Sequence, residues 1–317
     1  MKKYNSIEQF RNVIRKVRTK HDFKGVDSDG NAIYSHDSPY PILKFKGTVK
    51  LHGTNAGIVL YKNGNLEYQS RSRVLSLQSD NMGFCTYMNG VNLGSLFDSI
   101  YFEDYIAIYG EWCGEGIQKG VGISELSRRF VIFDVCVDGV FLEHYGRDIP
   151  ESNIYCIENF KTFEIDIDFN SPEEYQNKLI EWTLQVEEEC PVSKKFGVSG
   201  IGEGIVFTCV SDRSLKFKSK GEKHSSSKVK VLNSVDVDRI NDYKEFVEYA
   251  CTENRLNQGL ENVTSRDIKN TGEFIKWVAN DILKEEKDTL VNNNIEWKKV
   301  AGMIAKKSSE FFRSIAD

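Results

Sequence analysis

The sequence predicts an α+β protein, in which a domain of antiparallel sheets with flanking helices is followed by a small all-helical domain. Between about residues 42 and 232, short β-like runs alternate with glycine and polar turns. After about residue 233, apolar residues recur at i, i+3 and i+4, the spacing of amphipathic helices. We therefore expect domains at residues 1–232 and 233–317.

Each predicted element has a local signal. Residues 1 to about 40 predict a helix followed by a polar loop, and the helix signal is the spacing of Ile7, Phe10, Val13, Ile14 and Val17. The strand-like runs are ILKFKGTVKLHG, AGIVLY, LEYQSRS, YIAIYGEW, FVIFDVCV, GEGIVFT and SLKFKSK. Asn63-Gly64, between the second and third runs, predicts a tight hairpin.

Helices are predicted at four further places. The insert SPEEYQNKLIEWTLQVEEE starts with Ser171 as N-cap, Pro172 at the first helical position and Glu174 completing a capping box. The three helical segments after residue 233 are VDRINDYKEFVEYAC, SRDIKNTGEFIKWVANDILKEE and NIEWKKVAGMIAKKSSEFFRSI. Their amphipathic pattern predicts a small bundle.

Charge and cysteine usage restrict the class of protein. The net charge of −5 does not by itself favour a nucleic-acid partner, yet the stretch 212–230 has seven Lys and Arg against two acids. The seven cysteines form no C-x-x-C pair, so neither a disulfide framework nor a zinc finger is expected. This usage favours a reducing cytoplasm, that of the host if the protein is viral. No run of 18 apolar residues predicts a membrane span.

Lys50 stands in the most distinctive local pattern, Lys50-Leu51-His52-Gly53-Thr54-Asn55. A strand-like run ends at the lysine, and Gly53 permits a turn with close backbone approach to a ligand. In strand alternation Lys50 and His52 share a face. A lysine acts as a nucleophile when its surroundings activate it. On this pattern alone, a solvated strand-end lysine is at least as good an explanation.

Other charged residues stand at predicted strand ends. Arg71 and Arg73 are expected to share a face, where guanidinium groups bind phosphate or face solvent. Glu111 follows YIAIYG, where a carboxylate holds ribose hydroxyls or a metal, or is merely solvated. Glu203, between two glycines at the start of a buried strand, favours a functional role because an unpaired buried acid is costly. Lys216 and Lys218 share one face, as on many half-exposed strands.

Six short motifs occur in the order Lys-x-His-Gly, Ser-Arg-Ser, Gly-Glu-Trp, Phe-Asp-Val, Glu-Gly-Ile-Val and Lys-Phe-Lys. Over roughly residues 40–220 this series resembles the covalent nucleotidyltransferases, which include ATP-dependent DNA and RNA ligases and mRNA capping enzymes. The histidine in the first motif, with GEWCGEGIQKGVGISEL and SRSRVL…SDNMGF, resembles the RNA ligase family typified by bacteriophage RNA ligase 2. The resemblance implies an ATP-grasp-like ligase domain of antiparallel sheets.

The resemblance implies a role for each motif residue. Lys50 would attack the α-phosphate of ATP and form lysyl-AMP, His52 would act in later steps, and Lys216 and Lys218 would neutralise the α-phosphate. Phe133 and Ile205 would pack on the two faces of adenine. Other nucleotide contacts would come from Val49, Asn55, Arg71 and Glu111, and Mg²⁺ or Mn²⁺ would be held by Glu203 and Glu111. Family members often carry glutamate at the position of Val49. The change is harmless if that position reads adenine through its backbone, and it affects base specificity if the carboxylate reads the base.

The implied function is an ATP-dependent RNA ligase that transfers AMP to a 5′-phosphate end and seals it to a 3′-OH in RNA repair. We expect the protein to be a monomer. Its expected partners are RNA or RNA-containing strands with such ends, and no membrane partner is expected. A GTP-dependent capping guanylyltransferase would need a strand-rich OB-fold after residue 220, which the pattern lacks. A DNA ligase is disfavoured by the histidine variant and the helical tail. A catalytically silent nucleic-acid-binding module is disfavoured because Lys50 and Glu203 are both present.

The helices after residue 233 carry lysines near their end, at positions 298, 299, 306 and 307. We expect this domain to grip the nucleic-acid backbone beside the reactive ends, mainly without reading bases. The alternative is a packing appendage that only stabilises the first domain.

Overall fold

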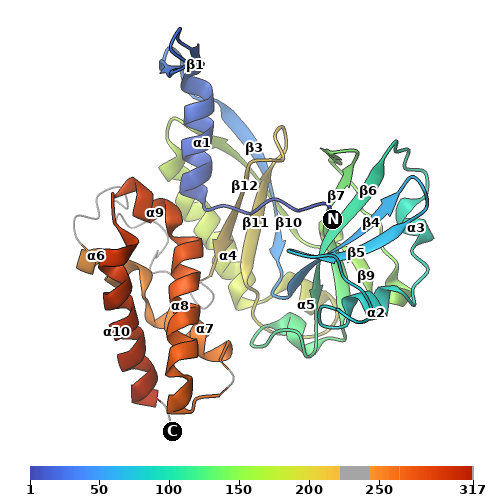
Figure 1. The fold of residues 1–317 in the computed structure, drawn as a ribbon. Helices are drawn as coiled ribbons and strands as arrows, with labels where there is room; N and C mark the ends of the chain where they lie inside the picture. The colour runs from blue at the N-terminus through green and yellow to red at the C-terminus, as the bar shows by residue number, and fades with distance from the viewer. Residues whose placement is uncertain (222–242, 264, 316–317) are drawn as a thin grey trace. The chain divides into compact units, whose positions relative to one another are not determined.

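The structure, a computed structural model, describes residues 1–221, 243–263 and 265–315. The chain divides into two units, Met1–Gly221 and Glu222–Asp317 (Figure 1). The predicted boundary between residues 232 and 233 lies outside the described residues. The predicted α+β class is confirmed, because the first unit contains two large sheets with helices around them and the described part of the second unit is helical.

A four-stranded antiparallel sheet has the order β10-β3-β11-β12. Its strands are β3 (Ile42–Lys50), β10 (Thr162–Asp168), β11 (Gly204–Cys209) and β12 (Lys216–Lys220). Strand alternation places Phe45, Phe207 and Phe217 together on one face, where their rings pack at centroid distances of 5.0–5.4 Å. The helices α1 (Phe10–Asp22) and α4 (Gln176–Glu188) contribute buried residues to this core.

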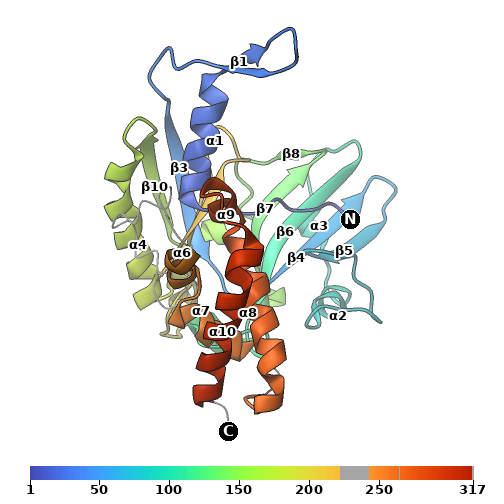
Figure 2. The same cartoon turned by 60° about the vertical axis from the view of Figure 1, so that its left-hand side comes forward.

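The second large sheet has the order β5-β4-β6-β7-β8, and β9 pairs in parallel with β7. Its strands are β4 (Thr54–Tyr61), β5 (Leu66–Ser70), β6 (Tyr105–Cys113), β7 (Arg129–Val137), β8 (Val140–Phe141) and β9 (Ile154–Cys156). One face packs on α2 (Phe84–Met88) and α3 (Gly94–Phe97). Figures 1 and 2 show this sheet on the opposite side of the four-stranded sheet from α1 and α4.

Most predicted strands are confirmed, and so is the hairpin, because β4 and β5 pair around Gly64, whose φ of +82° favours glycine. The predicted loop before residue 40 instead contains a two-stranded hairpin of β1 (Phe23–Val26) and β2 (Ala32–Tyr34). The edge strand β10 was also not predicted. The remaining short helices of this unit are α5 (Pro191–Lys195) and the 3₁₀ turns Gly122–Glu125, Pro150–Ser152, Ile157–Asn159 and Pro172–Tyr175.

The predicted capping box at the start of the helical insert is wrong. Ser171 makes no side-chain cap hydrogen bond, and the chain enters a 3₁₀ turn at Pro172 before α4 begins at Gln176. The backbone N–H of Glu174 donates to the carbonyl of Ser171 at 3.2 Å. A backbone hydrogen bond of the 3₁₀ turn therefore takes the place of the expected side-chain cap.

The described part of the second unit consists of helices around a core of its own. These are α6 (Tyr243–Ala250), α7 (Glu253–Glu261), the 3₁₀ turn Ile268–Asn270, α8 (Thr271–Glu285), α9 (Lys287–Asn292) and α10 (Trp297–Ile315). On α10 the residues Val300, Ile304, Ser308 and Phe312 are buried at a spacing of four, as the sequence pattern predicts. Thr252 caps α7 by accepting from the N–H of Arg255, and α7 and α9 are additions to the three predicted helices.

All seven cysteines are buried and free, and they pack as small apolar residues. Within the described residues, no helix is both long enough and apolar enough to span a bilayer.

Candidate functional site

A cavity of about 70 Å³ lies between the facing surfaces of the two large sheets. The four-stranded sheet contributes Thr48, Lys50, Val206 and Thr208, which alternate with the buried core residues of β3 and β11. The second sheet contributes Glu111, Val131, Phe133 and Asp134, and the N-terminal segment contributes Tyr4 and Ile7. Apolar walls with a few convergent charged groups are typical of a small-molecule site.

Lys50, the last residue of β3, pairs with a buried carboxylate. Its Nζ lies 2.7 Å from Oε2 of Glu203, which immediately precedes β11. Lys220, at the end of β12, approaches the other oxygen, with Nζ 3.1 Å from Oε1. Both lysines lie opposite Gly204 in the strand register, so the sheet itself directs the two ammonium groups to one carboxylate.

Gly204 is required by the close approach of two strands. Its φ is +147°, and a Cβ there would lie 2.1 Å from the carbonyl oxygen of Ser219 on β12. Any side chain would push β12 away from β11 and move Lys220 from Glu203. The Glu-Gly pair therefore combines a buried acid with the residue that allows its cations to reach it.

The charge of Glu203 is stabilised by its neighbours. Burial raises the pKa of this carboxyl, but Lys50, Lys220 and His52 outweigh that effect and hold the pKa well below its usual range. His52 contributes through its Nδ1, which lies 3.5 Å from Oε2 of Glu203. Glu203 is therefore an ionised acceptor that orients Lys50, and it is a weak base.

Glu111 lines the cavity, and its environment differs from that of Glu203. Burial raises its pKa to about 7, while Lys50 opposes the shift and Glu203 adds to it. The backbone N–H of Gly53 donates to this carboxyl. Gly53 itself has no room for a side chain, since a Cβ would lie 2.4 Å from the carbonyl oxygen of Trp112. Asn55 stands opposite Glu111 in the β4–β6 register.

A β-bulge brings two consecutive residues of β7 to the cavity. The β6–β7 register shifts between Tyr109 and Gly110, so that Phe133 is the extra residue on β7. Phe133 and Asp134 both line the cavity, although strict alternation would place them on opposite faces. Asp134 is 4% exposed and accepts from Arg213 Nη2 at 2.6 Å and from Lys216.

Residues 1–9, here called the N-terminal strap, run from one sheet to the other (Figure 1), and Tyr4 and Ile7 of this strap line the cavity. At one end Glu8 exchanges backbone hydrogen bonds with β12, to Lys216 and from Lys218, at 3.1 and 2.9 Å. At the other end the backbone of Lys2 bonds the Gln69 side chain on β5 at 2.9 and 2.6 Å. The strap is therefore held by both sheets.

Tyr4, in the middle of the strap, fills one end of the cavity. Its ring lies 5.0 Å from the rings of both Phe133 and Tyr109. Its hydroxyl donates to Asp134 Oδ2 at 2.7 Å and accepts from Lys216 Nζ at 2.6 Å. Burial and the adjacent Asp134 raise the pKa of this phenol well above its usual value, so it stays neutral.

A family model described as RNA ligase matches residues 44–230, which is more than half of the 317-residue chain. The chain belongs to the RNA ligase family. The match includes both sheets and every predicted site residue, so the family predicted from the sequence is confirmed. No curated protein matches.

Solved structures similar to this RNA ligase family member include several of Naegleria gruberi RNA ligase. A lysine-to-alanine mutant with ATP and Mn has 16% identity and a TM-score of 0.43, over 68% of this chain and 55% of that one. A glutamate-to-alanine mutant with AMP and Mn has 16% identity and a TM-score of 0.45, over 70% and 56%. The chain thus spans little more than half the length of that ligase.

The structure brings together most of the residues predicted for the RNA ligase site. Lys50, Val49, Glu111 and Phe133 line the cavity. His52 and Glu203 form the ionic contacts described above, and Asn55 is the register partner of Glu111. Their predicted roles toward the nucleotide remain proposals.

Ile205 is the exception. It is fully buried and belongs to the core under α1 and α4, on the opposite face of β11 from the cavity. The adjacent residue Val206 lines the cavity instead. Because a shift of one residue along a strand changes the face, Ile205 faces the core, and Val206 stands at the cavity position predicted for it.

The predicted arginine pair also differs from expectation. β5 ends at Ser70, so Arg71 and Arg73 lie beyond the strand and do not share a strand face. Arg73 donates to the carbonyls of Ser79 and Asp80 at 2.6 and 2.7 Å, whereas Arg71 donates to Ser6 of the strap at 3.2 Å.

The basic stretch 212–230 is not an open stripe in its described part. Lys216 is 5% exposed and bonded to Asp134 and Tyr4, and burial lowers its pKa despite the nearby carboxylate. Lys218 shares the face of Val206, its register partner. Arg213 pairs with Asp134 and Lys220 with Glu203. Residues 222–230 lie outside the described part of the chain.

Sequence reasoning missed Tyr4, Asp134 and Lys220. Lys220 has the same strand parity as Lys216 and Lys218, so alternation along LKFKSK was a usable signal. Asp134 stands in the Phe-Asp-Val motif, but its place at the cavity depends on the bulge. Tyr4 is far from every motif in sequence, and its position follows from tertiary structure alone.

Proposed function

We propose that this chain is an ATP-dependent RNA ligase in which Lys50 forms lysyl-AMP, passes AMP to a 5′-phosphate RNA end and enables sealing to a 3′-OH. The observation that carries the proposal is Lys50 Nζ, held 2.7 Å from Glu203 at a cavity between two sheets in a member of the RNA ligase family. A monomeric state, a cytoplasmic location and a role in RNA repair belong to the same proposal.

The reaction takes three phosphoryl transfers. Lys50 Nζ forms a bond to the α-phosphorus of ATP as the bond to pyrophosphate breaks. A 5′-phosphate oxygen then displaces the lysine, and a 3′-OH finally displaces AMP to form the phosphodiester. Such transfers depend mainly on positioning and charge neutralisation, which the lysines around the cavity supply.

The predicted site residues take the following roles in this proposal. Glu203 orients Lys50, whereas Glu111, with a pKa of about 7, is suited to exchange a proton near neutral pH or to hold ribose hydroxyls. Phe133 and Val206 are the apolar residues for the two faces of adenine. Lys216 and Lys218 would neutralise the α-phosphate, with Asn55 and Arg71 as further nucleotide contacts.

The two carboxylates fit a Mg²⁺ or Mn²⁺ ion. Glu203 is a buried ionised acid, and the raised pKa of Glu111 indicates that a cation nearby would stabilise its charged form. When bound, such an ion supplies charge neutralisation at the phosphates. Ligand pockets commonly hold about 300–1,000 Å³, so we expect Tyr4 and the strap to move when the nucleotide enters this smaller cavity.

Strand sealing tests the proposal. The full chain is incubated with ATP, Mg²⁺ and RNA substrates labelled at the 5′-phosphate: a nicked duplex, a broken loop and a single strand. We expect the label to become resistant to phosphatase in at least one substrate, with ATP and not with GTP. Transfer of GMP from GTP to a 5′-diphosphate end, without sealing, would instead indicate a capping enzyme.

A further inference from the structure

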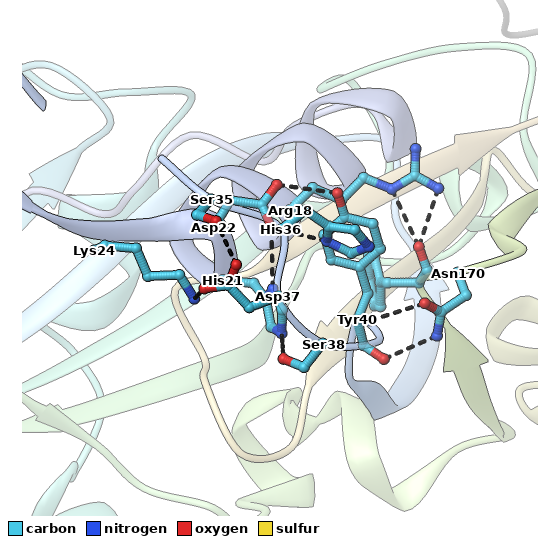
Figure 3. Close-up of polar contacts among 11 residues, drawn as sticks. Arg18, His21, Asp22, Lys24, Ser35, His36, Asp37, Ser38, Tyr40 and Asn170 are labelled. Carbon is cyan, nitrogen blue, oxygen red and sulfur yellow. Dashed lines mark hydrogen bonds and ion pairs between the residues drawn. The ribbon is translucent and has the colours of Figure 1, made fainter. Parts of the chain in front are cut away.

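Two histidines and a carboxylate meet at the end of α1, and none of them lines the cavity between the sheets. His21 and Asp22 are the last two residues of α1, and His36 follows β2. The Nδ1 atoms of both histidines lie 3.1 Å from Oδ1 of Asp22 (Figure 3). One potential ligand atom from each residue lies within 4.8 Å of the others.

We propose that His21, Asp22 and His36 bind one divalent transition-metal ion, with zinc preferred. Zinc bonds of about 2.0–2.2 Å place tetrahedral ligand atoms roughly 3.3–3.5 Å apart, close to the 3.1 Å separations here. Imidazole nitrogens favour zinc and its neighbours, whereas Mg²⁺ prefers oxygen ligands. Three protein ligands leave a fourth position for water.

The surrounding residues orient these ligands. The hydroxyl of Tyr40 donates to the second oxygen of Asp22, Oδ2, at 3.0 Å. The Oγ of Ser38 lies 3.2 Å from Nε2 of His21, the nitrogen that would not bind the metal. Hydrogen bonds of this kind fix ligand orientation at metal sites, and their loss typically weakens binding by 10–100-fold.

Tyr40 is in turn held by the rest of the domain. Its backbone N–H donates to Asn170 Oδ1 at 2.8 Å, and Asn170 Nδ2 donates to its carbonyl at 2.9 Å. The guanidinium of Arg18 lies over its ring at 5.1 Å and donates to the carbonyl of Phe169. In Figure 3, Asn170 and the guanidinium of Arg18 lie to the right of Tyr40 and His21 lies to its left.

Electrostatics at the end of α1 also favour a cation. Asp22 places a negative charge at a helix C-terminus, where the helix dipole favours positive groups.

A metal would connect the β1–β2 hairpin to the domain. The hairpin exposes Phe23, Val26, Ile33 and Tyr34, so it has little buried core. A two-stranded hairpin is only marginally stable by itself. His21 and Asp22 precede β1 and His36 follows β2, so one ion would fix both ends of the hairpin.

A zinc-binding measurement on the full chain tests this proposal. It is made without ATP or RNA, so its result is independent of ligase activity. Chelator-treated protein without an affinity tag is dialysed against Zn²⁺ in excess Mg²⁺, which occupies oxygen-ligand sites. The variants are His36→Ala, Tyr40→Phe and the control His144→Ala. His36 and His144 are 52% and 70% exposed, so neither change is expected to unfold the protein.

We expect the wild type and His144→Ala to bind one more Zn²⁺ per chain than His36→Ala, and Tyr40→Phe to bind it about tenfold more weakly. Zn²⁺ should raise the Tm of the wild type and of His144→Ala more than that of His36→Ala. Equal zinc content and equal Tm shifts in the wild type and His36→Ala would overturn the proposal. The cluster would then be a set of hydrogen bonds between histidines and a carboxylate.

Discussion

At the residue scale, the chemistry of the cavity depends on two acids in contrasting environments. Glu203 is surrounded by three cationic or potentially cationic groups, Lys50, Lys220 and His52, and stays ionised. Burial disfavours the charged form of Glu111 and raises the pKa of this carboxyl to about 7. The sequence indicated both acids, but not this difference, because the cations around Glu203 come from β3, β12 and the loop after β3.

Glu111 gives the fold a specific dependence on pH. The folded carboxyl keeps its proton up to about pH 7, whereas the unfolded one ionises near pH 4.5. The folded state therefore binds more protons between these values, and this group lowers stability as pH rises through the window. We expect Glu111→Gln to be more stable than the wild type at pH 8 by roughly 1–3 kcal/mol. Urea unfolding with chelator at pH 4 and pH 8 measures this, and an equal difference at both values would contradict it.

The residues proposed to bind adenine differ from the adjacent core residue in the strand face on which they lie. We expect Phe133→Ala and Val206→Ala to raise the KM for ATP in enzyme adenylation by about tenfold, since stacking on a base contributes roughly 1–3 kcal/mol. Ile205→Val is the matched control, because it trims a core residue one position away and should lower stability by about 1 kcal/mol without changing that KM. A KM raised by Ile205→Val and unchanged by Val206→Ala would restore the original prediction.

At the element scale, the strands with long apolar runs were predicted from the sequence, whereas the edge strand β10 was missed. β3, β4, β6 and β7 combine apolar runs with clear ends, so their existence followed from the sequence. β10 alternates as TFEIDID, and that period of two was a usable signal. The bulge in β7 has no such signal, because it depends on pairing with β6.

Gly204 allows β11 and β12 to pair at the site, and its replacement tests that role. In Gly204→Ala the new Cβ would lie 2.1 Å from the carbonyl of Ser219 at a φ of +147°. We expect a loss of about 2–4 kcal/mol in unfolding free energy and loss of adenylation, as Lys220 moves from Glu203.

Gly64→Ala is the control for backbone strain, because its φ is +82° and nothing lies within 4 Å of the added Cβ. It should cost about 1 kcal/mol and leave adenylation intact. Thermal or urea unfolding measures stability, and label transfer from ATP measures adenylation. Equal stability and activity losses in the two variants would contradict a special role for β11–β12 packing.

At the scale of the whole molecule, the proposed nucleotide chemistry and the proposed RNA binding belong to different units. All the residues assigned to nucleotide chemistry lie in Met1–Gly221, and the family match ends at residue 230. The helical unit has its own core, and Lys298, Lys299 and Lys306 are exposed on α10, while Lys307 pairs with Glu248 at 2.9 Å. We propose that this unit grips the RNA backbone.

Deletion of residues 233–317 tests that division. We expect the truncated chain to form lysyl-AMP with ATP but to lose sealing of a phosphorylated nick and salt-sensitive binding to it. Circular dichroism and a cooperative melt confirm that the first unit is folded. Sealing at near the full rate would show that the helical unit is a packing appendage.

The proposed function requires Lys50 to carry the adenylate. The wild type, Lys50→Ala and Lys46→Ala are incubated with α-labelled ATP and Mg²⁺, denatured, and mapped by mass spectrometry. Lys46 is the matched control, because it lies on the same face of β3 but pairs with Glu158 at 2.9 Å. We predict an AMP adduct on Lys50 in the wild type and in Lys46→Ala, and none in Lys50→Ala. An adduct on another residue, or undiminished labelling of Lys50→Ala, would contradict the assignment of Lys50 as the adenylated residue.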